Sequence, residues 1–266
     1  MIGLELETVE LETAERVAWV TLNRPDALNA WIRELGRDLT AALDHVAEDP
    51  DVRAIVLAGA GRAFSAGADL KAGSEVGENG KPDVLTRLRS VYNPLVLRVR
   101  TIPKPVIAAV NGPAVGIGCS LALATDMIVA AESAYFLLAF VNIGLGLDGG
   151  ASQSLPARVG HARAFEIALL GERVPAAKAL EWGMINRVVP DDELEQAVAE
   201  LAARFVAGPP GSYANIKRTI NASMYDRFDE VLDLEAVLQQ GRAESADFME
   251  GVLSFIEKRK PEFTGA

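Results

Sequence analysis

Short apolar runs that lead into glycine-rich loops constrain the fold of this chain more than any other feature of its sequence. Val17 to Leu22, Arg53 to Ala58 and Pro105 to Val110 have the length and apolar character of buried strands. Helical patterns alternate with them, and the one over residues 30–47 follows Asn29, a residue type that often caps helices. This alternation predicts an α/β fold with a buried sheet. The predicted strands cover residues 17–22, 53–58, 105–110, 127–131 and 134–138.

The pattern changes after about residue 190, where amphipathic helices follow one another without a strand between them. We therefore expect two parts, an α/β core over residues 1–200 and a helical region over residues 201–266. The apolar helix faces can pack against their own core or against another subunit, and the pattern leaves both open. The charged, glycine-rich segment over residues 74–82 is predicted to be a mobile surface loop. The predicted C-terminal helices cover residues 191–206, 212–224, 228–241 and 246–258.

Composition argues against several classes of partner. The net charge of −11 comes from 37 acidic and 26 basic residues, and such a charge repels nucleic acid and anionic lipid. Cys119 is the only cysteine, which excludes an intramolecular disulfide and suits a reducing compartment, so we expect a cytoplasmic protein. His45 and His161 lie in no ligand spacing, so no metal site is predicted. The N-terminal residues lack the pattern of a signal peptide, and the apolar stretch over residues 106–131 is too often interrupted for a membrane helix.

Two segments of small residues follow predicted strands and can present main-chain N–H groups to an anion. In residues 63–70 (AFSAGADL), small side chains let a ligand approach the backbone closely. Residues 111–120 (NGPAVGIGCS) open a predicted helix, whose first N–H groups and positive dipole end favour developing negative charge. Taken singly, each segment is equally compatible with a tight turn that binds nothing.

Asp148 is the one carboxylate in a glycine-rich, apolar segment over residues 142–150. Burial would disfavour its charged form, raise its pKa and suit it to proton transfer. Aspartate is also a preferred N-cap, and a helix is predicted over residues 149–159. On the sequence, Asp148 is therefore either an acid/base group or a helix cap.

These segments together resemble the enoyl-CoA hydratase/isomerase (crotonase) superfamily. The resemblance is carried by FSAGADL at residues 64–70, PKPVIAAVNG at 103–112 and ALATD at 122–126, and it extends over nearly the whole chain. It implies a crotonase-like spiral of β-β-α units with a C-terminal helical trimerisation region, assembled as a homotrimer or a dimer of trimers. It also implies an acyl-coenzyme A thioester substrate, no permanently bound cofactor, and an oxyanion hole formed by the N–H groups of Ala68 and Ile117. Such donors stabilise the enolate of a thioester.

The resemblance assigns further residues to the two parts of that substrate. The residues it places near coenzyme A are Arg24, Ala27, Ala66, Gly67, Asp69, Leu70 and Lys71. Lys260 and Phe263 near the C-terminus are placed there too, from the same or from a neighbouring subunit. The residues placed near the acyl group are Asn93, Val115, Gly116, Phe140 and Leu145. Their mainly apolar lining would suit an aliphatic or aryl acyl group.

Departures from the family pattern bear on the reaction. Typical hydratases hold a water with two glutamates, and this chain has Ser120 and Phe140 at those positions. Asp148 falls at the acid/base position of the isomerases, and YNPL at residues 92–95 resembles the phenylacetate-pathway ring isomerases. Related dehalogenases need a His and a Trp where this chain has Asn93 and Phe140. We therefore expect an enoyl-CoA or ring-epoxide isomerase, with a hydratase or a non-catalytic acyl-CoA binder as the alternatives.

Overall fold

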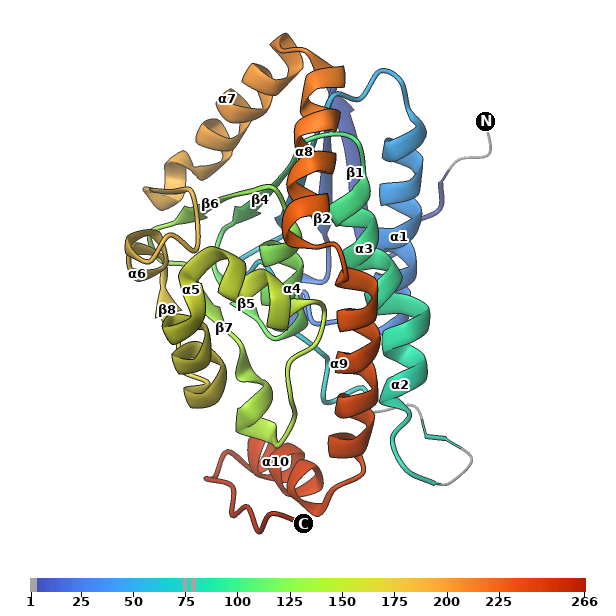
Figure 1. Cartoon of the computed structure of the whole chain (residues 1–266), viewed down its shortest axis with the longest axis vertical. Helices are drawn as coiled ribbons and strands as arrows, with labels where there is room; N and C mark the ends of the chain where they lie inside the picture. The colour runs from blue at the N-terminus through green and yellow to red at the C-terminus, as the bar shows by residue number, and fades with distance from the viewer. Residues whose placement is uncertain (1–3, 74–75, 78–79) are drawn as a thin grey trace.

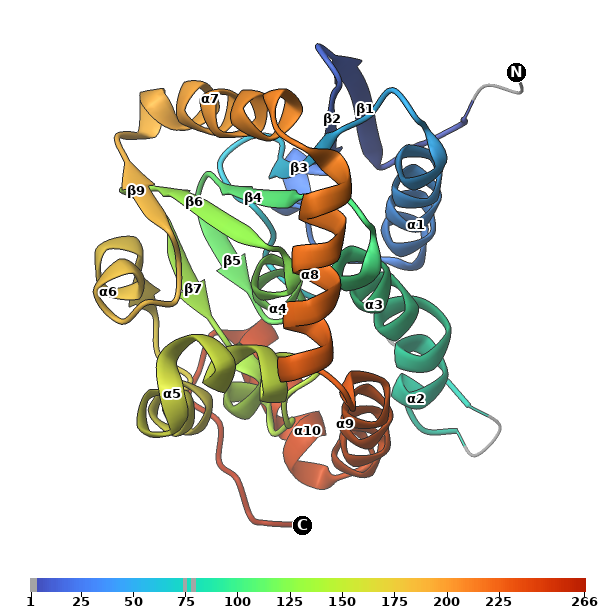
Figure 2. The ribbon, with the colours of Figure 1, turned by 45° about the horizontal axis from the view of Figure 1, so that its top comes forward.

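The computed structural model describes residues 4–73, 76–77 and 80–266, which form two β-sheets with helices packed around them (Figure 1 and Figure 2). In the larger sheet the first two strands are antiparallel and the other neighbours are parallel. Its strands, in spatial order, are β1 (Val9–Ala14), β2 (Val17–Leu22), β3 (Ala54–Gly59), β4 (Val106–Val110), β6 (Met127–Ala131) and β9 (Arg187–Val189). The smaller sheet has the order β5 (Pro113–Val115), β7 (Tyr135–Leu137) and β8 (Val174–Pro175).

The predicted α/β architecture is confirmed, and the five predicted strands are β2, β3, β4, β6 and β7. The side chains of β4 are buried along its whole length, as expected for a parallel strand covered on both faces. The structure adds β1, β5, β8 and β9, which the sequence pattern did not single out. Most residues of β1 are exposed or half-buried, and the other three strands are only two or three residues long, so none of them gives a clear apolar signal.

Helices of the core pack against the larger sheet, α1 on β1 and β2 and α7 on β3, β4 and β6. Residues 84–101 form a run of three helical segments, of which the middle one, η2, is a π-helix. Of the residues predicted as a loop over 74–82, residues 74, 75, 78 and 79 lie outside the described part. The core helices are α1 (Arg33–Glu48), α2 (Val84–Arg87), η2 (Leu88–Tyr92), α3 (Asn93–Thr101), α4 (Ile117–Ala124), α5 (Ala151–Leu170), α6 (Ala176–Glu181) and α7 (Leu194–Ala207). The short 3-10 helices are η1 (Pro25–Ala27), η3 (Ala139–Ile143) and η4 (Asp191–Glu193).

Asn29 does not cap α1, so that prediction is wrong. The helix begins at Arg33, with Ile32 at its N-cap and no side-chain cap. The Asn29 side chain instead donates hydrogen bonds from Nδ2 to the main-chain oxygens of Ala60 and Ala63, at 2.9 and 2.8 Å, and its Oδ1 accepts a main-chain N–H at 2.8 Å. A buried asparagine with three main-chain partners fixes a loop as firmly as it would fix a helix end.

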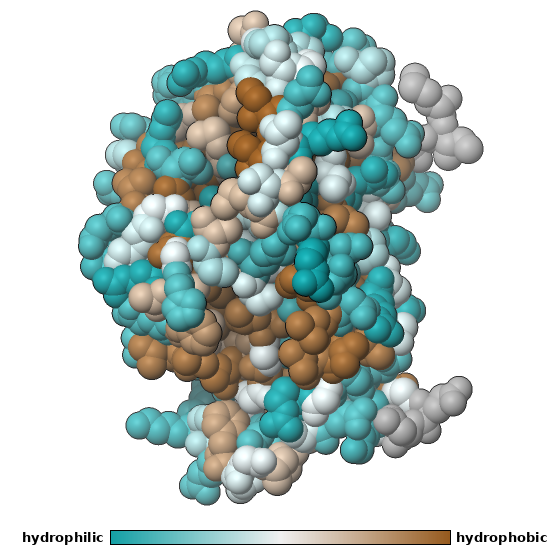
Figure 3. Space-filling model, viewed as in Figure 1, coloured by the Kyte–Doolittle hydropathy of each residue, from teal (hydrophilic) through white to brown (hydrophobic). Residues whose placement is uncertain are grey.

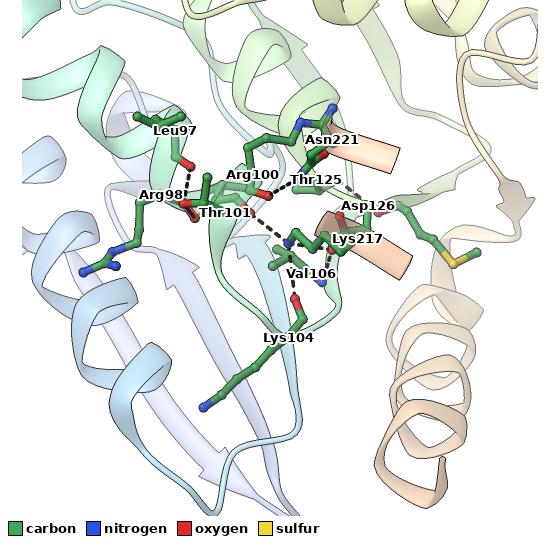
Figure 4. Close-up of polar contacts among 12 residues, drawn as sticks. Leu97, Arg98, Arg100, Thr101, Lys104, Val106, Thr125, Asp126, Lys217 and Asn221 are labelled. Carbon is green, nitrogen blue, oxygen red and sulfur yellow. Dashed lines mark hydrogen bonds and ion pairs between the residues drawn. The ribbon is translucent and has the colours of Figure 1, made fainter. Parts of the chain in front are cut away.

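The C-terminal helices α8 (Pro210–Met224), α9 (Phe228–Ala243) and α10 (Ala246–Glu257) follow one another without a strand between them, as the sequence pattern predicts. They lie along one side of the molecule (Figure 1). A buried polar network fastens α8 to the core (Figure 4). Lys217 Nζ lies 2.8 Å from Asp126 Oδ2, which also accepts the N–H of Val106 at 2.8 Å. Asn221 Nδ2 donates to the main-chain oxygen of Arg100 at 2.7 Å. Because Lys217 is only 9% exposed, these partners offset the cost of burying its charge.

The same helical region also leaves apolar side chains uncovered. On the face seen in Figure 3, hydrophobic surface gathers over α5 and α9. Large exposed residues there are Phe165, Leu169 and Leu170 on α5 and Leu234, Val237 and Leu238 on α9. The C-terminal helices therefore pack against their own core with one face and leave a second face free. In the described part of the chain, no helix combines the length and apolar character that crossing a membrane requires.

Candidate active site

The loop over residues 63–70 is fixed between two neighbouring segments. Ser65 is fully buried, and its Oγ accepts a hydrogen bond from the indole Nε1 of Trp31 at 3.1 Å. On its other side, Ser65 N–H donates to Pro113 O at 2.9 Å, and Val115 N–H donates to Ser65 O at 2.8 Å. The predicted loop is therefore joined to strand β5, which leads into the second glycine-rich segment.

The N–H of Ala68 is left free by this arrangement. Trp31 N–H donates to Gly67 O at 2.7 Å, and Asp69 N–H donates to Trp31 O at 3.0 Å, so Ala68 and Trp31 form a parallel bridge. In such a bridge the residue between the two bonded groups turns its own N–H away from the partner. The Ala68 N–H accordingly has no hydrogen-bond partner among the described residues.

Two glycines bring the second amide close to the first. A Cβ atom at Gly116 would lie 3.8 Å from Gly67 Cα, and one at Gly67 would lie 2.9 Å from Val115 O. Both glycines have positive φ, of +51° and +85°, so a side chain would be strained at either position. Ile117 follows as the first residue of α4, whose first N–H groups a helix leaves unbonded. Within the described residues its N–H has no partner. The contact between the glycines therefore joins the two segments that carry the free amides, the loop of Ala68 and the start of α4 at Ile117.

Asp148 lies against the first turn of α4, the helix that begins with the second of these amides. Ser120 Oγ donates a hydrogen bond to the main-chain oxygen of Asp148 at 2.9 Å. A Cβ atom at Gly149 would lie 2.7 Å from Ile117 Cδ1, so the residue after Asp148 touches the Ile117 side chain. The start of α4 therefore connects the carboxylate segment to the amide pair.

The carboxyl group of Asp148 is buried and keeps one oxygen free. Its Oδ2 accepts a hydrogen bond from Gln239 Nε2 at 3.1 Å, whereas Oδ1 has no partner in the described part of the chain. Burial, and after it the charge of Glu235, raises the pKa of Asp148 to about 7, against the opposing effects of the Gln239 hydrogen bond and Arg87. A carboxyl group with this pKa can both accept and release a proton near neutral pH.

Asp148 is not a helix cap, which removes one of the two interpretations left open by the sequence. Helix α5 begins at Ala151 with Gly150 at its N-cap and no side-chain cap from that residue. Its first N–H groups are bonded by Glu235 of α9, which accepts from Gly150 N–H at 2.7 Å and from Ser152 N–H at 2.9 Å. The carboxylate that caps α5 therefore comes from the C-terminal region, and the Asp148 side chain takes no part in capping this helix.

Phe140 and Leu145, both predicted near the acyl group, line an apolar cavity of about 420 Å³ between η3 and α5. The edge of the Phe140 ring also faces the glycine contact, since a Cβ atom at Gly116 would lie 3.9 Å from it. Val115, predicted in the same group, lies beside Gly67 and is half-buried. Phe140 therefore connects this cavity with the region of the two glycines.

Asn93 lies at the start of α3 and faces helix α9. Its Nδ2 donates to the main-chain oxygen of Leu232 at 2.9 Å. The residue is 9% exposed, and its Oδ1 has no partner among the described residues. Asn93 thus resembles Asp148 in presenting one buried oxygen that has no hydrogen-bond partner among the described residues.

Most of the residues predicted near coenzyme A lie at the first loop or in the adjoining segment over residues 24–28. Arg24 Nη1 and Nη2 each lie 3.2 Å from Asp69 Oδ2, which joins the segment before η1 to the loop. Lys71 is exposed just beyond it. Gly67 is buried, and the half-buried members of the region are Arg24, Ala27, Ala66, Asp69 and Leu70. Lys260 and Phe263 are exposed in the C-terminal tail beyond α10.

Comparison with known proteins identifies the family of this site. Residues 12–266 match the family Enoyl-CoA hydratase/isomerase. A probable enoyl-CoA hydratase from Rhodobacter capsulatus is 43% identical over 98% of this chain and 100% of that protein. The chain belongs to the enoyl-CoA hydratase/isomerase family. This family acts on coenzyme A thioesters, and the crotonase fold predicted from the sequence is confirmed.

Membership of this family leaves hydration and isomerisation both open. The 1,2-epoxyphenylacetyl-CoA isomerase of Escherichia coli is 41% identical over 98% of this chain and 99% of that protein. The crystal structure of an enoyl-CoA hydratase from Mycobacterium avium subsp. paratuberculosis has a TM-score of 0.88 at 39% identity, covering 98% of this chain and 100% of that one. That of a monofunctional enoyl-CoA isomerase from Mycobacterium smegmatis has a TM-score of 0.68 at 34% identity, covering 82% and 94%. Names of both kinds occur among the relatives, so the reaction has to be argued from the site.

Sequence reasoning missed three residues of this hydratase/isomerase site. Trp31 bonds the first loop through its main chain and its indole, whereas its sequence context indicates only an apolar position of a helix. Glu235 and Gln239 are polar residues inside an amphipathic C-terminal helix, where polar side chains are ordinarily solvated. They lie four positions apart and are 5% and 0% exposed. The spacing places them on one helix face, but only the fold shows that this face is buried.

Proposed function

We propose that this protein is an enoyl-CoA isomerase, acting on a 3-enoyl chain or an epoxide-bearing ring thioester, with Asp148 as its proton carrier. The observation that carries the proposal is a buried carboxyl group with a raised pKa, of about 7, and one unbonded oxygen. A single group that gains and loses a proton at neutral pH is what a double-bond shift requires, because the proton removed at one carbon is returned at another.

In the proposed reaction the thioester oxygen accepts hydrogen bonds from the N–H groups of Ala68 and Ile117. Asp148 removes a proton from the carbon next to the thioester carbonyl, and the negative charge moves onto that oxygen. Fixed main-chain donors stabilise this charge without reorganising. The Asp148 carboxyl group then returns the proton to carbon 4 of the acyl chain, so the double bond moves from carbons 3–4 to carbons 2–3. No atom is gained or lost.

The other candidate groups favour isomerisation over hydration. At the two positions where hydratases carry glutamates, the Ser120 hydroxyl donates to a main-chain oxygen at 2.9 Å and Phe140 is a buried ring. Glu235 lies nearby on α9, and both of its oxygens accept main-chain N–H groups. None of these three groups is placed to hold a water and remove its proton. Hydration is the competing function, because a relative named as a probable hydratase is 43% identical.

We further propose that the coenzyme A part of the substrate lies along Arg24, Asp69 and Lys71, and that residues 201–266 form an oligomerisation region on an acyl-CoA-binding core of residues 1–200. The expected assembly is a homotrimer or a dimer of trimers.

The apolar stripe on α9 supports the proposed oligomerisation region. Its residues Leu234, Val237 and Leu238 are exposed by 47–59%, and apolar side chains gathered on one exposed face mark interaction surfaces. Analytical ultracentrifugation of the wild type and of Leu238→Asp tests it, and a monomeric wild type would contradict it.

The reaction is tested with a panel of 3-enoyl-, 2-enoyl- and arylacetyl-CoA thioesters in water enriched in ¹⁸O, with products followed by mass spectrometry. An isomerase converts the 3-enoyl thioester at constant mass and incorporates no ¹⁸O. A hydratase adds one labelled water to the 2-enoyl thioester. Binding without turnover of any substrate would instead show an acyl-CoA-binding protein. Either of the last two results contradicts the proposed isomerase.

A further inference from the structure

We propose that Gln239 and Glu235 of helix α9 are positioning residues that set the orientation and the charge of Asp148. The proposal rests on the function proposed above, because it concerns the group that carries the proton there. It goes beyond that function by assigning a positioning task to the C-terminal helical region, through two side chains that act on Asp148.

Gln239 holds the Asp148 carboxylate in one orientation. Its Nε2 donates to Asp148 Oδ2 at 3.1 Å, and its Oε1 accepts the N–H of Gly146 at 3.0 Å. The glutamine amide is thereby fixed at both ends, so it can only present its N–H to the carboxylate. Gln239 is fully buried, and the hydrogen bond favours the charged form of its acceptor. It also leaves Oδ1 as the oxygen that is free to take a proton.

Glu235 acts on the same carboxylate through its charge. It lies one helical turn before Gln239 and accepts the N–H groups of Gly150 and Ser152, immediately beyond Asp148. Burial raises the pKa of Glu235, and these hydrogen bonds oppose that rise, since N–H donors at a helix start stabilise a carboxylate. A second negative charge nearby favours the protonated form of Asp148. Glu235 and Gln239 therefore oppose each other from the same helix face.

The remaining charged group that acts on Asp148 is Arg87, from α2. Its positive charge lowers the pKa of Asp148, as Gln239 does, whereas burial and Glu235 raise it. Arg87 lies over the Tyr92 ring, with its guanidinium carbon 5.7 Å from the ring centre. The two groups on α9 also bond the main chain on either side of Asp148, at Gly146 and at the start of α5.

The two residues predict opposite shifts of one observable quantity. Proton removal needs charged Asp148, so kcat/KM should rise with pH through the pKa of this group. Gln239→Leu removes the hydrogen bond that favours the charged form and should move this rise to higher pH by roughly one unit. Glu235→Gln removes a negative charge and should move it to lower pH by a similar amount, about one unit. A purely structural role would lower the rate without moving the pH at which it rises.

Matched controls separate this role from a general loss of stability. Gln240→Leu alters the neighbouring glutamine, which bonds Val84 N–H and Leu85 N–H rather than Asp148. Asp38→Asn alters another buried carboxylate that accepts main-chain N–H groups, those of residues 7 and 8. Both controls should lower the thermal midpoint and leave the pH profile where it is in the wild type.

The experiment measures kcat/KM with a 3-enoyl-CoA thioester from pH 5 to 9 for the wild type, both α9 variants and both controls. A parallel measurement compares the thermal midpoint of each protein with that of the same protein carrying Asp148→Asn. The difference between the two thermal midpoints should grow with pH until Asp148 of the folded protein has lost its proton. The pH at which it stops growing therefore reports the pKa of Asp148, and the measurement needs no turnover. Opposite shifts for the two variants, in both measurements, are expected.

Three outcomes would contradict one or other of these claims. Unmoved profiles in both α9 variants, with a wild type that turns over, would overturn the role of Gln239 and Glu235. A wild type that shows no turnover would instead overturn the proposed isomerase, and the thermal measurement would still decide whether α9 controls the charge of Asp148. Equal shifts in the same direction would also contradict the proposal, because the two residues act with opposite sign.

Discussion

The two halves of the site are built in different ways. The amide half consists of main-chain groups from the core, held by the contact between Gly67 and Gly116. The carboxylate half consists of Asp148 and side chains of α9, and the Asp148–Gln239 hydrogen bond joins residues 91 positions apart. The amide half depends on close backbone approach, which only particular residues allow, whereas the carboxylate half depends on which side chains a distant helix buries. The amide half is therefore expected to set how well the negative charge on the thioester oxygen is stabilised. The carboxylate half is expected to set the pH at which Asp148 transfers a proton.

The largest effect is expected from Asp148→Asn, which removes the proton carrier and leaves the amide half intact. Loss of a general acid/base group lowers kcat by roughly 10²- to 10⁴-fold, while binding of the coenzyme A thioester should stay near that of the wild type. Steady-state kinetics and calorimetry measure the two quantities. Asp44→Asn, at a half-exposed ion pair with Arg98, is the control. Activity within about tenfold of the wild type in Asp148→Asn would remove Asp148 from the reaction.

The same substitution should stabilise the protein at high pH. Burial raises the pKa of Asp148 to about 7 in the folded state, against about 3.9 in an unfolded chain. Between these values the folded state binds more protons than the unfolded one, so wild-type stability falls as pH rises from about 4 to 7, by about 4 kcal/mol in total. Asp148→Asn lacks this loss. Urea denaturation from pH 4 to 8 should show its advantage growing over that range, and a constant difference would contradict the raised pKa.

The amide half is tested next by Ile117→Pro. Proline is tolerated at the first position of a helix, where its missing N–H bonds nothing within the helix, so α4 can form while one donor is lost. Removal of one such donor lowers kcat by roughly 10²- to 10³-fold. Ile117→Val keeps the N–H and should retain most of the activity. The pH at which kcat/KM rises should stay at its wild-type value in Ile117→Pro. A shift of that pH would show that the amide half also affects the pKa of Asp148.

The smallest effect is expected outside both halves, from Arg24→Ala. If Arg24 contacts the coenzyme A part equally in the bound substrate and in the transition state, KM rises while kcat stays the same. A charged hydrogen bond of ordinary strength corresponds to about a tenfold change. Arg16→Ala, at an exposed pair with Asp51, is the matched control. A fall in kcat without a change in KM would assign Arg24 to the chemistry instead.

The difference between the two halves also explains how far the sequence could predict the site. Both glycine-rich loops could be predicted, because small residues in a short segment allow close approach to the backbone whatever the surrounding fold. Asp148 could be found as a lone carboxylate, but its two interpretations could not be separated. The group that caps α5 is Glu235, whose hydrogen bond to Gly150 N–H joins residues 85 positions apart. No local pattern indicates a cap supplied from so far along the chain.

The fold was predictable to a similar degree. Buried parallel strands such as β4 are recognised by their continuous apolar residues, whereas β1 is mostly exposed and β5, β8 and β9 are very short. Asn29 shows the same limit, since its residue type predicts a cap and only the tertiary structure shows that it bonds Ala60 and Ala63 instead. Local chemistry could be predicted from the sequence, and long-range partners could not.

The most direct measurement is a crystal structure of the Asp148→Asn variant with a bound 3-enoyl-CoA thioester. We expect the thioester oxygen within hydrogen-bond distance of both main-chain nitrogens, those of Ala68 and Ile117, with the side chain at position 148 facing the carbon next to the carbonyl. A thioester oxygen bound elsewhere, or one that reaches only one of the two nitrogens, would contradict the proposed site.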